Sequence, residues 1–165
     1  METKAAELLT TFKNPNVSVD AKVAQLTNIK SDIKQKNVPE GAIPTLFETL
    51  RLALNSQHHN VSTAGFSTLG HLIKRLSIQN QQQWIVSQAK SFYPLLLERL
   101  GDYKESVRAK AAQVFTDLWP MAHTDVEYYV LDCALIGKNP RAREASLHWL
   151  ARVRCPGLFD KRGQF

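Results

Sequence analysis

Apolar residues recur every three or four positions through most of the chain, which is the spacing of one face of an α-helix. The clearest stripe runs from Val107 through Ala111 and Phe115 to Leu118. Turn-forming Gly, Pro and Asn residues separate such stretches, and no alternating strand pattern of any length intervenes. The pattern therefore predicts an all-α fold.

The predicted helices come in pairs joined by short polar loops. Pro94 must kink or restart one of them, because its ring removes a backbone donor. Ser18 and Asn139 stand where side chains cap helix N-termini. The expected helices are residues 3–13, 18–36, 44–54, 61–76, 84–100 with the break at Pro94, 107–119, 124–136 and 140–153.

A faint internal repeat accompanies the pairs. Anchors near Val19, Val61, Val107 and Pro140 give a period of roughly forty residues, the range of HEAT-type helix pairs. Gly65 occupies the register of Ala111, where a small residue lets another helix come close. We therefore expect an α-solenoid of about four antiparallel HEAT-type pairs.

We expect the solenoid to fill residues 1–153 and an irregular tail to fill residues 154–165. A solenoid needs a polar-faced terminal repeat, because its last pair otherwise exposes core. The tail does not supply one. The sequence thus predicts that the chain is a fragment, or that its end departs from the repeat pattern.

The chain carries a formal net charge of +6. Such a surplus favours an acidic partner, whether nucleic acid, an anionic membrane surface or an acidic protein, although solubility alone accounts for it equally well. No apolar run is long enough to span a bilayer, and the start has no secretory signal. We expect a soluble intracellular protein with Cys133 and Cys155 reduced and Cys133 in the core.

No pattern for catalysis or for a metal or nucleotide site emerges. His58 and His59 are adjacent in a loop, and neighbouring side chains seldom share a metal. The other histidines are expected at helix caps or boundaries, and Trp119 and Trp149 are expected to pack in the core. HExxH, paired-Cys, P-loop and GxSxG patterns are missing from the sequence. The sequence predicts no enzyme, no cofactor and no metal.

The loops within the pairs carry the functional hypothesis. In stacked helix pairs these loops fall along one edge, at which the second helix of each pair begins with its partly positive N-terminus. Acids at the same edge temper its charge, and a merely solvated edge remains the alternative. The basic residues in or just after the loops are Lys13, Lys22, Lys104, Arg108, Lys138, Arg141 and Arg143, and the acids are Asp20, Asp102, Glu105 and Glu144.

Four stretches, residues 13–23, 29–41, 94–102 and 137–142, closely resemble the N-terminal TOG domain of fungal CLASP proteins, the cytoplasmic linker-associated, spindle-stabilising family. The resemblance covers about residues 1–150 and runs through loops as well as core. It implies a TOG array of HEAT repeats whose intra-pair loops face tubulin, in a protein that stabilises dynamic microtubules and helps to form the mitotic spindle. It also implies a location at the cytoplasmic cytoskeleton and spindle, and in the nucleus during mitosis.

The four intra-pair loops are residues 14–18, 55–60, 101–106 and 137–139. By position, the resemblance implies that the tubulin-facing residues lie in or just after the third and fourth of these loops: Lys104, Arg108, Lys138, Asn139 and Arg141. The first loop has Pro15, Asn16 and Val17 where many tubulin-binding TOG domains have a Trp, and four pairs are expected where such domains have six. The alternative is a HEAT adaptor that binds a kinetochore or spindle protein, or another copy of itself, without touching tubulin. Nucleic acid and membranes are not expected partners.

Overall fold

The computed structural model describes residues 1–154. These residues form helices and turns, and the described part of the chain contains no strand. They divide into two compact units, Met1–Phe92 and a second unit that begins at Tyr93. The all-α prediction is confirmed. Among the described helices, none combines the length and the apolar character that crossing a bilayer requires.

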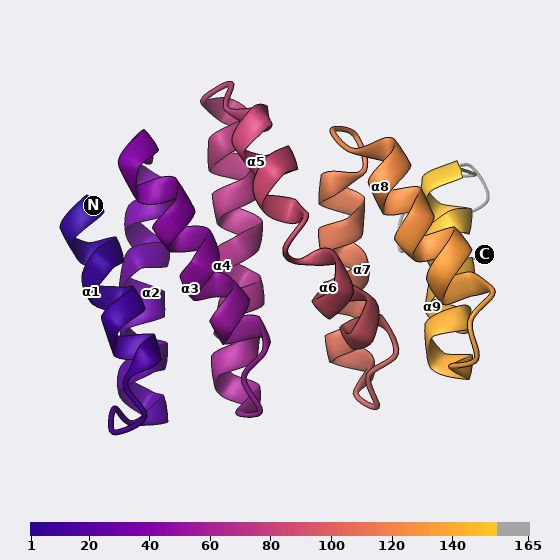
Figure 1. The fold of residues 1–165 in the computed structure, drawn as a ribbon, viewed down its shortest axis with the longest axis horizontal. Coiled ribbons are helices and arrows are strands. Elements are labelled where there is room, and N and C mark those ends of the chain that lie inside the picture. The colour runs from indigo at the N-terminus through magenta and orange to yellow at the C-terminus, as the bar shows by residue number, and fades with distance from the viewer. Residues whose placement is uncertain (155–165) are drawn as a thin grey trace. The chain divides into compact units, whose positions relative to one another are not determined.

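Unit 1 consists of two antiparallel helix pairs followed by a shorter helix (Figure 1). The second helices of the two pairs pack along each other, as do the first helices. Its elements are α1 (Glu2–Lys13), α2 (Val19–Gln35), the 3₁₀ turn η1 (Glu40–Ala42), α3 (Ile43–Leu54), α4 (His59–Ile78) and α5 (Gln82–Ala89).

Local sequence signals explain these boundaries. The Ser18 hydroxyl accepts a hydrogen bond from the Ala21 backbone N–H at 3.1 Å, which confirms the predicted cap of α2. Pro44 lies in the first turn of α3, where its missing N–H costs nothing. Gly65 of α4 lies against Ala53 of α3, so the small residue does allow close helix contact.

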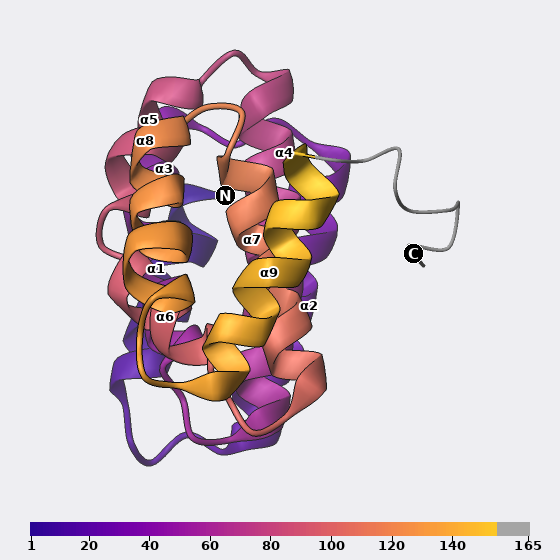
Figure 2. The same ribbon diagram turned by 90° about the vertical axis from the view of Figure 1, so that its right-hand side faces the viewer.

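Unit 2 contains the other two pairs. Helices α6 and α8 lie on one side of this unit, and α7 and α9 lie on the other (Figure 2). Because α5 ends at Ala89 and α6 begins at Tyr93, the predicted restart near Pro94 is confirmed. The elements are α6 (Tyr93–Leu100), α7 (Glu105–Leu118), α8 (His123–Glu127), the π-helix η2 (Tyr128–Leu135) and α9 (Pro140–Arg154).

The helix expected over residues 124–136 differs from the prediction in two ways. It begins at His123 after Ala122, which provides no side-chain cap, so the expected Thr124–Asp125 cap is wrong. From Tyr128 it continues as a π-helix. A π-helix bonds each residue to one a position further along the chain than an α-helix does, which changes the direction of later side chains. Accordingly, Cys133 is only partly buried instead of lying in the core.

The two tryptophans of unit 2 pack as a T-shaped pair with ring centroids 6.4 Å apart. Trp149 is buried, as expected, whereas Trp119 is half-buried and its indole Nε1 donates to Glu127 Oε1 at 3.3 Å. Helix α9 runs through Arg154. Cys155 and the rest of the predicted irregular tail lie outside the described residues, and the predicted domain division therefore stays a prediction.

Tyr93 provides a test of the unit 2 core. Its ring stacks between Phe115 and Tyr129, at centroid distances of 6.2 and 4.9 Å. Its hydroxyl is buried and has no hydrogen-bond partner among the described residues. Burying a hydroxyl that forms no hydrogen bond reduces the stability of the fold. Because Tyr93→Phe removes this hydroxyl, it should raise the free energy of unfolding by about 1 kcal/mol. Urea denaturation would measure the change, and Tyr103→Phe at an exposed ring is the control.

The same substitution should flatten the alkaline limb of the stability profile. Burial, helped by the nearby Asp125 carboxylate and by Tyr129, raises the pKa of Tyr93 to about 12 from its ordinary value of 10.0. The folded protein therefore keeps this proton while the unfolded chain loses it, and stability falls as pH rises from 10 towards 12. Identical alkaline profiles for the parent and Tyr93→Phe would contradict this assignment.

Candidate protein-binding loop edge

Two loops of unit 2 lie at the same end of that unit (Figure 1). The first, residues 101–104, joins α6 to α7, and the second, residues 136–139, joins η2 to α9. We call these two loops, together with Arg108 and Arg141, the loop edge of unit 2. It contains every residue for which the sequence predicted a tubulin-facing role.

The first loop is held from within by Asp102. One carboxylate oxygen accepts the Lys104 backbone N–H at 2.9 Å, and the other pairs with Arg99 at 3.4 Å. The Gly101 and Asp102 backbone N–H groups close the end of α6 on carbonyls one turn earlier. Asp102 therefore does more than reduce the positive charge, as the sequence suggested, because it fixes the path of the loop.

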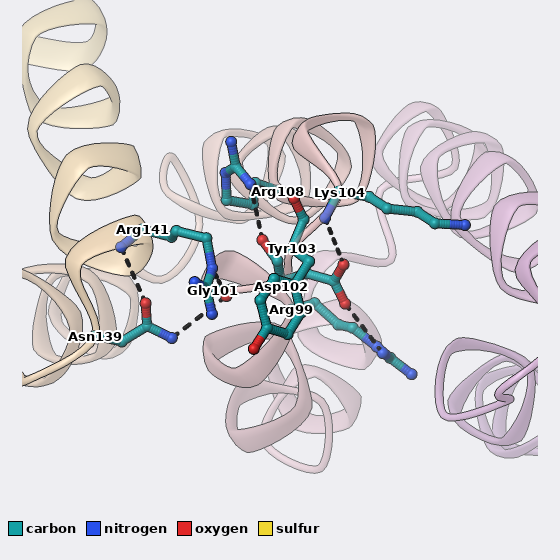
Figure 3. Close-up of polar contacts among 8 residues, drawn as sticks. All are labelled: Arg99, Gly101, Asp102, Tyr103, Lys104, Arg108, Asn139 and Arg141. Atoms are coloured by element: carbon teal, nitrogen blue, oxygen red, sulfur yellow. Dashed lines mark hydrogen bonds and ion pairs between the residues drawn. The ribbon is translucent and has the colours of Figure 1, made fainter.

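Arg108 braces the same loop from α7. Its Nη1 donates to the carbonyl oxygens of Asp102 and Tyr103, at 2.8 and 2.9 Å. A loop with few residues exposes carbonyls that need partners, and a guanidinium can serve two of them. Arg108 is positively charged, but part of its hydrogen-bonding capacity is used by the backbone carbonyls of the loop (Figure 3).

The second loop is joined to the first through Asn139 and Arg141. Asn139 Oδ1 accepts from the Arg141 and Ala142 backbone N–H groups at 2.9 and 3.3 Å, which confirms the predicted cap of α9. Asn139 Nδ2 and Arg141 Nε both donate to the Gly101 carbonyl, at 3.3 and 2.9 Å (Figure 3). A Cβ on Gly101 would come within 2.3 Å of Asn139 Nδ2, so this contact requires glycine.

These bonds present Tyr103 to solvent. Its side chain is 85 % exposed, and the Arg141 guanidinium lies 4.1 Å from the ring centroid. A cation over an aromatic face restrains both side chains. Ile136 in the neighbouring loop is 77 % exposed. The sequence analysis missed both residues, although an aromatic and a branched apolar side chain within polar loops are the signal that could have identified them.

Lys104 and Lys138 differ from the two arginines. Both side chains are exposed, and within residues 1–154 neither forms an ion pair. They are the cations of the loop edge that are free to meet a partner. The five predicted residues thus separate into two free lysines and three residues, Arg108, Asn139 and Arg141, that hold the loops together.

The loops of unit 1 have less available charge. They lie together at one end of that unit (Figure 1). Lys13 pairs with Glu48 of α3 at 3.5 Å, and Lys22 lies over the Phe12 ring at 5.8 Å. The single basic edge that the sequence predicted across all four loops stays a prediction.

The histidines lie at varied positions. His123 begins α8, as expected for a boundary residue, whereas His148 lies within α9, where it faces Glu144 at 3.7 Å, so the boundary expected there is wrong. His59 is the first residue of α4, so of the two histidines expected in a loop only His58 precedes the helix. His71 lies well inside α4 and is neither a cap nor a boundary residue, so that expectation is wrong. Among the described residues, no group of three or more His, Cys, Asp or Glu side chains is placed to hold a metal.

Comparison with known proteins decides the family. The family model described as CLASP N terminal matches residues 1–154. The chain belongs to the CLASP N-terminal family. CLASP N-terminal domains and their fungal relatives are structural proteins, not enzymes, so the prediction of no enzyme is confirmed.

The relatives are fungal. The chain is 60% identical over 153 residues to Protein stu1 of Aspergillus fumigatus, covering 93% of this chain and 11% of that protein. It is 58% identical over 153 residues to Protein STU1 of Coccidioides immitis, covering 93% and 12%. The chain therefore spans only about a tenth of the length of these relatives.

Solved structures confirm the fold. The TOG domain of human Cep104 matches with a TM-score of 0.70 at 14% identity, over 99% of this chain and 68% of that one. At this identity the likeness concerns the fold alone. The CLASP family assignment and this structural match together make the chain an N-terminal TOG domain built from HEAT-type helix pairs.

Proposed function

We propose that this TOG domain is a tubulin- and microtubule-binding module whose loop edge in unit 2 contacts an acidic tubulin surface. The observation that carries the proposal is the locked pair of loops, which displays Lys104, Lys138 and the Tyr103 ring. In the whole protein this contact would help to stabilise dynamic microtubules and to form the mitotic spindle, at the cytoskeleton and spindle and in the nucleus during mitosis. CLASP family membership supports that role.

The geometry suits protein recognition. Loops already held in one conformation lose little entropy on binding, so more of the contact energy contributes to affinity. Tyrosine and arginine are enriched among the residues that dominate interface energies, and Tyr103 and Arg141 stack together here. Exposed lysines at the rim mainly raise the association rate with an acidic surface.

The charge test should use the two free lysines. Lys104→Glu with Lys138→Glu should weaken microtubule co-sedimentation by about tenfold or more, because two attractive contacts become repulsive. Reversing Arg108 or Arg141 is a poorer test, since either change also releases loop carbonyls. Co-sedimentation over a range of microtubule concentrations gives the affinity, and the helical circular dichroism signal checks folding.

Lys90→Glu with Arg152→Glu is the matched control. Both cations are exposed and lie outside the loop edge, and the pair changes the net charge equally. The proposal predicts that the control pellets nearly like the parent. If the two double variants lose binding to the same extent, overall charge explains the result and the loop edge does not.

The alternative is a HEAT adaptor that binds a kinetochore or spindle protein, or a second copy of the chain, without tubulin contact. The exposed Ile136 favours this alternative, since an apolar side chain suits many protein surfaces. Tubulin pull-down at low and moderate salt separates the two functions, because contact driven by charge fades as screening increases. Absence of tubulin capture even at low salt would leave the adaptor.

A further inference from the structure

Unit 1 carries a second concentration of positive charge, away from its loops. Helices α2 and α4 pack along each other, and Lys30 Nζ of α2 reaches Ser67 Oγ of α4 at 3.4 Å. Lys34 and Lys74 are exposed, while Lys30 and His71 are partly buried. We call Lys30, Lys34, His71 and Lys74 the α2–α4 basic patch.

Carboxylates do not balance this patch. Helix α4 contains no Asp or Glu along its whole length. The nearest acid of α2, Asp32, already pairs with Lys4 of α1 at 2.7 Å. Mutual repulsion among unbalanced cations opposes folding. Burial lowers the pKa of His71, and the charged groups that lower it further are Lys34 and Lys30 from α2 and Lys74 from α4, all of them cations.

Helix dipoles account for only part of the arrangement. A cation in the last turn of a helix is stabilised by the partly negative C-terminus, and Lys34 lies in the last turn of α2. Lys30 and Lys74 precede the last turns of their helices, where this effect has faded. Their alignment across two helices therefore requires another explanation.

We propose that the α2–α4 basic patch binds an extended acidic segment of a partner protein, rich in Glu and Asp. The inference is independent of the function proposed for the loop edge. Each lysine carries a point charge on a flexible side chain. Such side chains can pair with the carboxylates of an acidic chain that has no fixed conformation. The neighbouring Arg75 is not a free fork for phosphate, because its guanidinium donates to the Ile33 and Lys34 carbonyls.

A nucleic acid fits this surface less well. Single strands bind on exposed aromatic rings, which stack with the bases. Among the described residues of unit 1, the large apolar side chain that is exposed is Ile78, which has no ring. The patch therefore offers charge without a stacking surface.

The test measures binding of a fluorescein-labelled poly-glutamate peptide to the full chain by anisotropy at low salt. Lys30→Gln, Lys34→Gln and Lys74→Gln together should weaken binding about tenfold, the sum of three modest surface pairs. The matched control, Lys90→Gln, Lys110→Gln and Arg152→Gln, removes the same charge outside the patch and the loop edge and should change affinity by less than about twofold. Circular dichroism confirms that both variants fold.

A second measurement addresses the site directly. Carboxylates beside an imidazole favour its protonated form, so saturating peptide should raise the pKa of His71 in an NMR titration. Equal losses in the two triple variants, or an unchanged His71 pKa, would overturn the proposal. The proposal would also be overturned if a single-stranded oligonucleotide of the same charge bound more tightly than the peptide and the patch variant abolished that binding. If Lys104→Gln with Lys138→Gln weakened peptide binding more than the patch variant does, the peptide would bind at the loop edge, and the proposed function would stand.

Discussion

Phe115→Ala is expected to lower the free energy of unfolding by about 3–5 kcal/mol, the range for removing a buried aromatic side chain. Phe115 is fully buried on α7 and stacks on Tyr93. The loss combines the transfer energy of the ring with the cost of the cavity left behind. Since a domain of this size has a total stability of about 5–15 kcal/mol, the variant should retain only part of it.

Urea denaturation followed by tryptophan fluorescence would measure this change, because Trp119 and Trp149 both lie in unit 2 with Phe115. The control is Leu147→Ala on α9, whose side chain is 57 % exposed. That substitution should change stability by less than about 0.5 kcal/mol. A loss of under about 1 kcal/mol for Phe115→Ala would mean that α7 does not anchor the core of this unit.

Gly65→Val should destabilise unit 1 by about 2–3 kcal/mol. A Cβ at Gly65 would approach the Ala53 Cβ to 2.8 Å and the Leu54 Cδ1 to 3.0 Å. The Ala53 methyl is fixed to the α3 backbone and cannot turn away, so the two helices must separate. Loss of the α3–α4 contact outweighs the small gain in helix propensity that valine has over glycine.

Gly70→Val on the same helix is the control for this substitution. A Cβ at Gly70 would have no heavy atom within 4 Å, and the change should alter stability by less than about 0.5 kcal/mol. Thermal unfolding of both variants gives the comparison. A double-mutant cycle of Gly65→Ala with Ala53→Gly should be non-additive, because the second change restores the space that the first one fills. Equal effects of valine at positions 65 and 70 would show that helix propensity, and not the contact, decides the outcome.

The braced loops decide which charge variants of this domain test partner contact alone. An arginine close to a proposed interface can contribute by contacting a partner or by holding its own loop. Arg108 and Arg141 donate to carbonyls at 2.8–2.9 Å, so their loss would deform the loop edge even without a partner. Substitutions of Lys104 and Lys138 change the charge without breaking bonds within the loops, so they separate the effect of charge from the effect of loop structure.

Much of the fold could be predicted from local sequence. The 3.6-residue periodicity placed the helices within a few residues, since an amphipathic stripe depends only on neighbours along the chain. Ser18 and Asn139 were predicted as caps because their side chains bond N–H groups two or three residues away. The small residue at Gly65 likewise indicated a close helix contact.

Other features could not be predicted in this way. The π-helix over η2 had the same apolar spacing as an α-helix would have, so periodicity did not distinguish them. The expectation that Arg108 and Arg141 face a partner came from their position near the loops. Their bonds to Gly101, Asp102 and Tyr103 depend on how long side chains fold back in three dimensions.

The sequence by itself determined the helical pairs, the caps at Ser18 and Asn139 and the concentration of cations near the loops, because these follow from spacing and composition along the chain. Only the tertiary structure decided which cations are free, since Lys104 and Lys138 extend to solvent while Arg108 and Arg141 bond to carbonyls. It also decided that Lys30 and Lys34 of α2 lie beside His71 and Lys74 of α4. These side chains are about forty residues apart in the chain, and packing of one helix against another is what brings their charges together.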